Sequence, residues 1–264
     1  MKRRPAGRET ETVIYGIHAV GHCLESFPDR VIELLVAEDR QDRRLGSIVE
    51  TALKAGLKAV SVDRRILDGR AAGGAHQGVL AMIRPRPPGN ENDLAELLDG
   101  IPGKAFLLIL DGVQDPHNLG ACLRTADAAG IHAVVAPRNR AAGLTPAVRK
   151  VACGASETVP FMQVTNLART LRELGHRNIR RIGADGHAPV SIFEADLSGS
   201  IAIVMGAEGR GLRRLTRENC DLLVSLPMLG AVESLNVSVA TGICLYAALG
   251  QRPAGKLASD TGFD

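Results

Sequence analysis

The sequence predicts an α/β protein with two domains, a small one followed by a larger one that contains a parallel sheet. Its 264 residues suit two modest domains. Its composition, with 45% hydrophobic and 23% charged residues, is ordinary for a globular chain. Short apolar runs alternate along the chain with segments whose apolar residues have helical spacing. A Pro-rich stretch at 84–92 interrupts this alternation, as is typical of a linker.

The elements expected before this stretch are short. Strands are predicted at 31–39, 57–63 and 78–84 from their β-branched and apolar runs. A helix is predicted over 44–56, where apolar residues recur at helical spacing and Gly56 suits a C-cap. These elements predict a small α/β domain.

The alternation is clearer after the Pro-rich stretch. Apolar segments are predicted as strands at 105–111, 132–137, 158–163, 180–185, 200–206 and 221–227. Helical patterns separate most of them. Near-continuous apolar strands that alternate with helices indicate a parallel sheet covered on both faces.

These patterns set the expected domain boundaries. The first domain is expected at 13–84, a linker at 85–104 and the second domain at 105–252. The polar ends at 1–12 and 253–264 are expected to be flexible tails.

The composition excludes several classes of protein. Aromatic residues make up 3% of the chain, so the core must be aliphatic and the aromatic platforms of many single-strand RNA binders are not expected. The net charge of +3 is too small to indicate a nucleic-acid partner by itself. The longest apolar run, at 105–110, is too short to cross a bilayer, and no apolar segment follows the basic N-terminus. We therefore expect a cytoplasmic protein with no membrane partner.

The cysteines and histidines indicate neither a disulfide framework nor a metal site. The five cysteines are widely spaced with no C-x-x-C pair, which is typical of reduced thiols. Cys122, Cys153 and Cys244 lie among apolar residues and are expected in the core. His18 and His22 share a helical face, but no further metal ligand has suitable spacing, so no metal is expected.

Three loops that follow predicted strands are candidates for chemistry, because ligands bind beyond the carboxyl ends of strands in open parallel sheets. The first loop, at 111–130, enters a helix expected to be capped near Asn118. Arg124 lies off the apolar face of that helix, so its guanidinium is able to reach outward toward a ligand. The alternative interpretation is that Asn118 is only a cap and Arg124 only a solvated side chain.

The second loop, at 205–212, is a Gly-rich turn around Glu208. Its order G-x-x-G-x-G differs from the dinucleotide fingerprint, and the acidic G-x-G-x-G motif of Rossmann methyltransferases is absent from the sequence. Four arginines between Arg210 and Arg217 either contact phosphate or form a solvated helix face.

The third loop, at 226–249, opens a helix near Ser234 and Asn236 that is apolar nearly all round. Such a helix is expected to be buried, here against a second copy of the protein. Ser234 and Asn236 are either ordinary caps or contacts to a cofactor or a ribose.

Motifs in these loops, in this order, resemble those of the SpoU (TrmH-like) branch of the SPOUT superfamily of RNA methyltransferases. They are N-x-G-A-x-x-R-T-A at 118–126, G-A-E-G-x-G at 206–211 and P-M-x-G-x-x-x-S-L-N-V-S-V-A at 227–240. In the first domain, YGIHAV at 15–20 and HQGV at 76–79 look like the substrate-binding domain of this family.

The resemblance implies a fold, an activity, a cofactor and partners. It implies a small L30e-like RNA-binding domain followed by a SPOUT domain with a C-terminal trefoil knot. The implied activity is methyl transfer from S-adenosylmethionine to a ribose 2′-hydroxyl of RNA. Family members are homodimers that share the active site between subunits. The two-domain form is most similar to enzymes that methylate a guanosine in the peptidyl-transferase P-loop of 23S rRNA.

The resemblance also implies roles for individual residues. The catalytic group would be Asn118, Arg124, Glu208, Ser234 and Asn236. The backbone around four residues would enclose the cofactor, namely Gly206, Leu226, Met228 and Leu235. A ribose hydroxyl is a weak nucleophile, so attack requires positioning and loss of a proton. Arg124 serves either as the base or, because arginine stays protonated, as the group that holds a phosphate and stabilises alkoxide charge.

Two other functions are weighed against this one. A tRNA 2′-O-methyltransferase of the same family is less favoured, because such members often lack the full first domain. A non-catalytic RNA-binding or ribosome-assembly protein is also less favoured, because the catalytic set is intact. Binding of S-adenosylmethionine would separate an enzyme from a binding protein.

Overall fold

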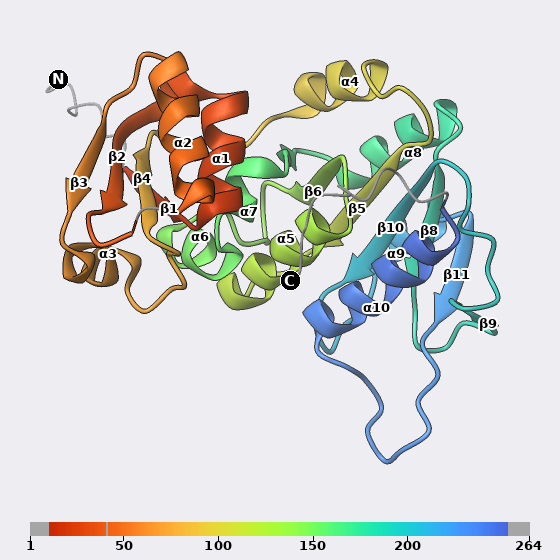
Figure 1. Cartoon of the computed structure of the whole chain (residues 1–264). Helices are drawn as coiled ribbons and strands as arrows, with labels where there is room; N and C mark the ends of the chain where they lie inside the picture. Colours follow the sequence, from red (N-terminus) through yellow and green to blue (C-terminus); the bar gives the residue numbers. More distant parts are fainter. Residues whose placement is uncertain (1–10, 41, 253–264) are drawn as a thin grey trace, which may run out of the picture. The chain divides into compact units, whose positions relative to one another are not determined.

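The computed structural model describes residues 11–40 and 42–252. The expected tails lie outside these residues, except for Glu11 and for Thr12, which begins a strand. The chain divides into two compact units, each an α/β structure as the sequence predicts (Figure 1). Of these described residues, unit 1 comprises those within 11–87 and 144–158, and unit 2 comprises those within 88–143 and 159–252.

Unit 1 contains a four-stranded sheet in the order β1-β4-β2-β3. The strands are β1 (Thr12–Tyr15), β2 (Val31–Ala37), β3 (Ala59–Val62) and β4 (Val79–Ile83). β4 is antiparallel to both its neighbours, and β3 is parallel to β2. The helices are α1 (Ile17–Ser26), the 3-10 helix η1 (Pro28–Arg30), α2 (Arg43–Lys54), α3 (Arg64–Ala71), α6 (Pro146–Ala152) and α7 (Ala155–Thr158).

Apolar side chains cover both faces of this sheet. Successive side chains of a strand point to opposite faces. Leu34 of β2 therefore joins a core with α1 and α2, whereas its neighbour Leu35 joins a second core with Leu67 of α3. The three strands and the helix predicted for this part of the chain correspond to β2, β3, β4 and α2. β1 was not predicted.

Unit 2 contains a seven-stranded parallel sheet in the order β7-β6-β5-β10-β8-β11-β9. The strands are β5 (Phe106–Asp111), β6 (Ala133–Pro137), β7 (Phe161–Val164), β8 (Arg180–Ala184), β9 (Val190–Ser191), β10 (Ile201–Gly206) and β11 (Leu222–Ser225). The helices are α4 (Glu91–Asp99), α5 (Pro116–Ala128), α8 (Leu167–His176), α9 (Arg214–Glu218) and α10 (Val237–Gly250). The prediction of a parallel sheet is confirmed.

Helices cover both faces of this sheet. On one face, α4 and α8 pack against alternate residues of the central strands, such as Leu107 and Ile109. α5 and α10 pack against each other, and Cys122 Sγ lies 3.6 Å from Thr241 Oγ1 between them. The predicted inner face of α5 is buried at Leu119, Cys122, Leu123 and Ala126.

The segment at 85–104, expected to be a linker, folds largely into unit 2. Asn90 and Asp93 form a capping box at the start of α4, and Leu94 is buried in the core of the unit. The Gly89 N–H donates to the Phe161 carbonyl over 2.9 Å, which joins this segment to β7. Pro88 is the last proline of this stretch. Because proline has no backbone N–H to donate, α4 begins only after it.

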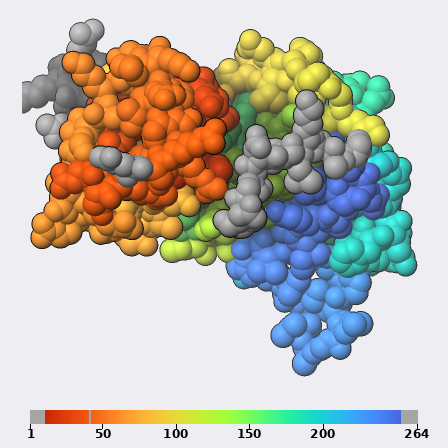
Figure 2. Space-filling view, in the orientation of Figure 1, coloured from red at the N-terminus to blue at the C-terminus, as the bar shows by residue number. Residues whose placement is uncertain are grey.

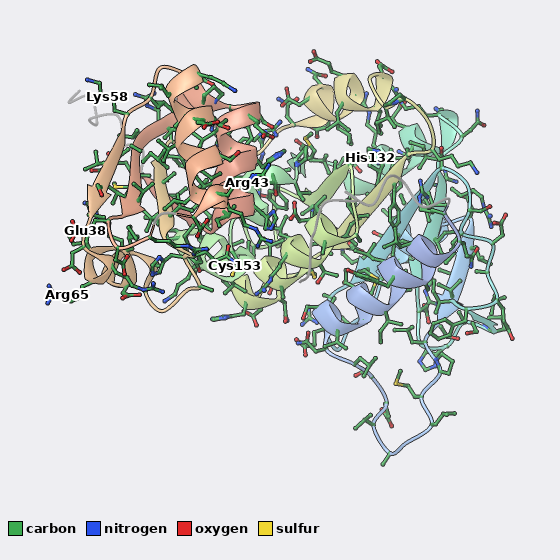
Figure 3. The ribbon with its side chains drawn as sticks, viewed as in Figure 1. Glu38, Arg43, Lys58, Arg65, His132 and Cys153 are labelled. Carbon is green, nitrogen blue, oxygen red and sulfur yellow. The ribbon has the colours of Figure 1, made fainter. Side chains whose placement is uncertain are left out.

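A second difference concerns residues 144–158, which the sequence places within the second domain but which belong to unit 1. Because α7 continues to Thr158, the strand expected at 158–163 begins only at Phe161. Cys153, expected in the core, is exposed. Figure 3 labels its position. Cys153 follows α6 in the left-handed conformation, with φ of 51°, and so leaves the buried face of the helix.

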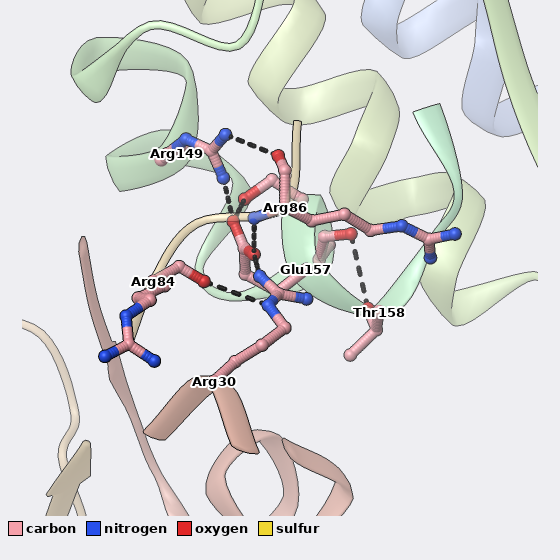
Figure 4. A network of polar contacts seen from close by, with 8 residues as sticks. Arg30, Arg84, Arg86, Arg149, Glu157 and Thr158 are labelled. Atoms are coloured by element: carbon pink, nitrogen blue, oxygen red, sulfur yellow. Dashed lines mark hydrogen bonds and ion pairs between the residues drawn. The ribbon is translucent and has the colours of Figure 1, made fainter. Parts of the chain in front are cut away.

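Glu157 of α7 carries a buried carboxylate at the centre of a polar network (Figure 4). Arg30 and Arg149 both form ion pairs with it, and the Arg86 N–H donates to Oε2 over 2.9 Å. Burial, together with the charge of Arg30, lowers the pKa of Arg149 to about 10, so the Arg149 guanidinium stays charged at neutral pH. The buried carboxylate therefore compensates two partly buried positive charges and anchors residues 144–158 within unit 1.

Candidate active site

Three of the predicted catalytic residues form a hydrogen-bonded chain, which we call the asparagine chain. Asn118 Nδ2 donates to Glu208 Oε2 over 3.2 Å. Asn236 Nδ2 donates to Asn118 Oδ1 over 2.9 Å. Asn236 Oδ1 in turn accepts from the Ser238 N–H over 2.9 Å, which caps α10. Asn118 thus contacts two loops that lie 90 and 118 residues further along the chain.

The sheet topology brings these loops together. Asn118 follows β5 and Glu208 follows β10, and these two strands are paired neighbours. Chain order reverses at this point of the sheet, where ligands bind in open parallel folds. Asn118 is not the N-cap expected from the sequence, because Asp115 accepts from the His117 N–H and caps α5. Asn118 is instead in the first turn, 7% exposed, where a polar side chain requires partners.

The Gly-rich turn at 206–211 presents Glu208 to Asn118. Ala207 and Gly211 exchange backbone hydrogen bonds of 3.1 and 2.9 Å, so the turn closes on itself. A side chain at Gly206 would collide with the backbone of Gly211, and Gly209 has φ of 73°. These glycines are therefore explained by the shape of the turn.

Asp111 is a buried carboxylate at the end of β5 whose role was not predicted from the sequence. It accepts from the Arg213 N–H over 2.9 Å and from Arg213 Nε over 2.5 Å. This pair fixes the segment after the Gly-rich turn to the neighbouring strand. The sequence feature that could have indicated this role is an acidic residue directly after the apolar run at 105–110.

Arg124 and Ser234, the other predicted catalytic residues, are exposed. Arg124 lies on α5 outside its buried face, as the sequence predicts. Ser234 lies in the loop that precedes α10. Their side chains are therefore accessible to a ligand, whereas Asn118 is enclosed.

The residues expected to enclose the cofactor belong to the Gly-rich turn and to the segment between β11 and α10. They are Gly206, Leu226, Met228 and Leu235, and all four are half-buried. The segment between β11 and α10 projects from unit 2 (Figure 2), and Leu229 within it is 99% exposed. Partly exposed apolar side chains beside backbone amide and carbonyl groups suit a ligand with both apolar and polar parts, such as an adenosyl group.

The two motifs of unit 1 have structural roles. Gln77 Oε1 accepts from the Ile17 N–H at the start of α1 over 3.1 Å. His76 is buried, and its Nδ1 accepts from the Gly78 N–H over 3.1 Å. Nε2 therefore carries the proton and lies 2.9 Å from Asp68 Oδ1. The residues of HQGV hold the turn before β4 against the turn before α1.

The described residues contain no group of three or more His, Cys, Asp or Glu side chains arranged to hold a metal ion. The His22 ring packs edge-on against Phe27 at 5.8 Å. Across residues 11–40 and 42–252, every helix is too short or too polar to span a membrane.

The fold and the asparagine chain define an α/β protein with a polar site at the carboxyl edge of a parallel sheet. The model of the SpoU rRNA methylase family matches residues 105–246. The model of the RNA 2′-O ribose methyltransferase substrate-binding domain matches residues 13–89. The chain therefore belongs to the SpoU rRNA methylase family, as its motifs predict.

Individual relatives agree with this assignment. The 23S rRNA (guanosine-2′-O-)-methyltransferase RlmB of Photorhabdus laumondii is 53% identical over 240 residues, which cover 91% of this chain and 98% of the relative. A crystal structure of an RNA 2′-O ribose methyltransferase has 26% identity and a TM-score of 0.64, covering 92% of this chain and 89% of the other. The SpoU methyltransferase AviRb from Streptomyces viridochromogenes, in complex with AdoMet, has the same fold at 22% identity, with a TM-score of 0.69 over 92% of this chain and 91% of the other.

Proposed function

We propose that this protein transfers a methyl group from S-adenosylmethionine to the ribose 2′-hydroxyl of a guanosine in 23S rRNA, in the P-loop region. The asparagine chain carries the proposal, because it joins three motif residues of the family in one hydrogen-bonded group. The 53% identity to a 23S rRNA guanosine-2′-O-methyltransferase over most of both chains supports the substrate. The protein would act in the cytoplasm.

The chain's own residues divide the work. Asn118 fixes the positions of Glu208 and Asn236, so that a ribose would meet groups already oriented. Arg124 is exposed on α5, where it would hold a phosphate of the substrate and stabilise the charge that develops on the 2′-oxygen. Ser234 would contact the ribose or the cofactor. S-adenosylmethionine supplies the methyl group when it is bound, and Gly206, Leu226, Met228 and Leu235 would hold it.

We further propose that the protein is a homodimer through α10. Val239 and Tyr246 are seven residues apart on this helix, hence on one face, and they are 51% and 52% exposed. Leu249 extends the same exposed apolar surface. A second copy would bury these side chains and bring its own site close to the first.

The same proposal includes the domain roles and the chain path implied by the motifs. An L30e-like domain at 13–84 would select the RNA, and the second domain would bind the cofactor. The segment between β11 and α10 would complete a trefoil knot. The match of residues 13–89 to a substrate-binding domain model supports the first role.

Methyl transfer with purified protein tests the function. The protein is incubated with labelled S-adenosylmethionine and either unmodified 23S rRNA or unmodified tRNA, and the RNA is digested to nucleosides. We expect label in 2′-O-methylguanosine from 23S rRNA alone. Label in tRNA alone would favour the tRNA enzyme, and absence of both cofactor binding and transfer would favour the non-catalytic RNA-binding protein.

A further inference from the structure

A cavity of about 600 Å³ opens at the carboxyl edge of the unit 2 sheet. Its walls come from the loops after β6 and β7 and from the segment that follows the Gly-rich turn into α9. We call it the arginine pocket, after Arg140, Arg213 and Arg214 in its walls. It shares no residue with the group expected to enclose the cofactor.

The charge of the arginine pocket is positive. Three arginines line it, and none of its lining residues is acidic. Arg213 is engaged by the buried Asp111, and Arg214 lies 2.7 Å from Glu218, in an exposed pair of the weak kind. The described residues contain no acidic partner within ion-pair distance of Arg140. Two guanidinium groups, those of Arg140 and Arg214, are thus available to an anion.

The backbone holds Arg140 at the pocket. Its φ of 59° is in the left-handed region, which a residue with a side chain adopts only where its surroundings impose it. The Arg140 carbonyl accepts from Gln114 Nε2 over 3.4 Å, and the Ala142 N–H donates to the Val113 carbonyl over 2.8 Å. The loop that carries Arg140 is therefore attached to the loop after β5, which leads to Asn118.

The remaining walls suit a nucleotide. Pro137 and the half-exposed Leu215 offer apolar surface, and Asn166 caps α8 at the pocket's edge. Guanidinium groups bind phosphate oxygens in a bidentate manner, and apolar surface accepts the face of a base or a ribose. The cavity volume of about 600 Å³ is in the usual range for pockets that bind small molecules, and a nucleotide is a ligand of that kind.

We propose that the arginine pocket binds one nucleotide of the substrate RNA adjacent to the methylated guanosine, with its phosphate on Arg140 and Arg214. This inference rests on the proposed function, and it adds a site that selects and positions the RNA strand. The pocket is anchored through Asp111 and Arg213 to the strand that precedes Asn118. RNA bound there would therefore be held in register with the asparagine chain.

Binding of a 23S rRNA transcript, measured at several KCl concentrations, tests the proposal. Arg140→Ala and Arg214→Ala are compared with Arg172→Ala, which removes an exposed charge from α8 outside the pocket. Removal of a guanidinium that binds phosphate is expected to weaken RNA binding about tenfold or more. It should also reduce the slope of log affinity against log salt by about 0.7 to 0.9 for each phosphate that the variant no longer neutralises. Arg172→Ala should retain the wild-type affinity and slope.

Cofactor affinity, measured by calorimetry with S-adenosylmethionine, separates the outcomes. The proposal predicts wild-type cofactor affinity in both pocket variants, with a higher KM for RNA and kcat within about twofold of wild type at saturating RNA. Unchanged RNA affinity and salt slope would overturn the proposal, as would a loss confined to cofactor binding. If the wild-type protein binds the RNA but methylates none, the proposed function fails, while the salt slopes still decide whether the pocket binds RNA.

Discussion

The side-chain amide of Asn236 donates a 2.9 Å hydrogen bond to Asn118 Oδ1, joining the first turn of α5 to the N-cap of α10. Asn118 is then obliged to point its own amide toward Glu208. One buried side chain therefore sets the orientation of two others, which come from different loops.

Asn118→Asp should disrupt this group, because it places a carboxylate against that of Glu208. We expect methyl transfer to fall about a hundredfold, and the free energy of unfolding to fall by about 1–3 kcal/mol through loss of a buried hydrogen bond. Urea unfolding and initial rates measure the two effects.

The double variant Asn118→Asp/Glu208→Gln provides the control, since the glutamine amide is able to donate to the new aspartate. The double variant should recover much of the stability that Asn118→Asp loses, because substitutions of interacting residues are not additive in a double-mutant cycle. If the effects of the two substitutions simply added, the hydrogen bond between them would have no energetic role.

Arg124→Ala should abolish methyl transfer while the fold and the affinity for S-adenosylmethionine persist. Arg124 is exposed on α5, so its truncation leaves no core cavity. Removal of one group that stabilises transition-state charge reduces the rate about a hundredfold or more. Single-turnover assays with 23S rRNA measure this, and a rate above one tenth of wild type would contradict a central role for Arg124.

Tyr246→Glu should convert a dimer into a monomer. The substitution places a charge in the exposed apolar face of α10, where a second copy would otherwise bury the ring. Sedimentation at micromolar concentration measures the mass of both proteins. A monomeric wild type, or a variant that dimerises as well as the wild type, would contradict the proposed interface.

Glu157→Gln should destabilise unit 1. The carboxylate is 2% exposed and pairs with Arg30 and Arg149, so neutralising it leaves two partly buried positive charges without compensation. The free energy of unfolding should fall by about 3 kcal/mol. Arg65→Ala is the control, since Arg65 lies at the periphery of unit 1 (Figure 3) and its ion pair with Asp63 is exposed. Equal effects in the two variants would show that Glu157 has no special structural role.

Alkylation of the native protein at pH 8 should favour Cys153 over Cys122 and Cys244. Burial raises the pKa of the Cys122 thiol to about 11 and that of Cys244 to about 12, so both remain protonated and unreactive. Cys153 is exposed. Peptide mass spectrometry after brief iodoacetamide treatment measures each rate, and equal rates in the folded protein would contradict the described packing.

The sequence predicted most of the strands in the core, because strands that are buried on both faces of a parallel sheet appear in the sequence as continuous apolar runs. It correctly predicted the buried face of α5 at Leu119 and Cys122. It also indicated Asn118, Glu208 and Asn236 as site residues, and these three are hydrogen-bonded in the structure. It did not predict their hydrogen bonds, because those depend on β5 and β10 being neighbours in the sheet.

Segments whose burial depends on distant partners were harder to predict. The capping box at Asn90 was obscured by the prolines before it. Residues 144–158 join unit 1 through the ion pair of Glu157 with Arg30, which is 127 residues away. Deletion of residues 1–92 would therefore remove partners of Glu157 and the N-terminus of α4, so it would not isolate an intact second domain.

Mapping of 2′-O-methyl groups in total rRNA and tRNA, from cells with and without this protein, tests the central claim most directly. We predict that one 2′-O-methylguanosine of 23S rRNA, in the P-loop region, disappears without the protein. It should return when the wild-type gene is restored, but not with Arg124→Ala. An unchanged 23S rRNA, or a loss confined to tRNA, would contradict the proposed function.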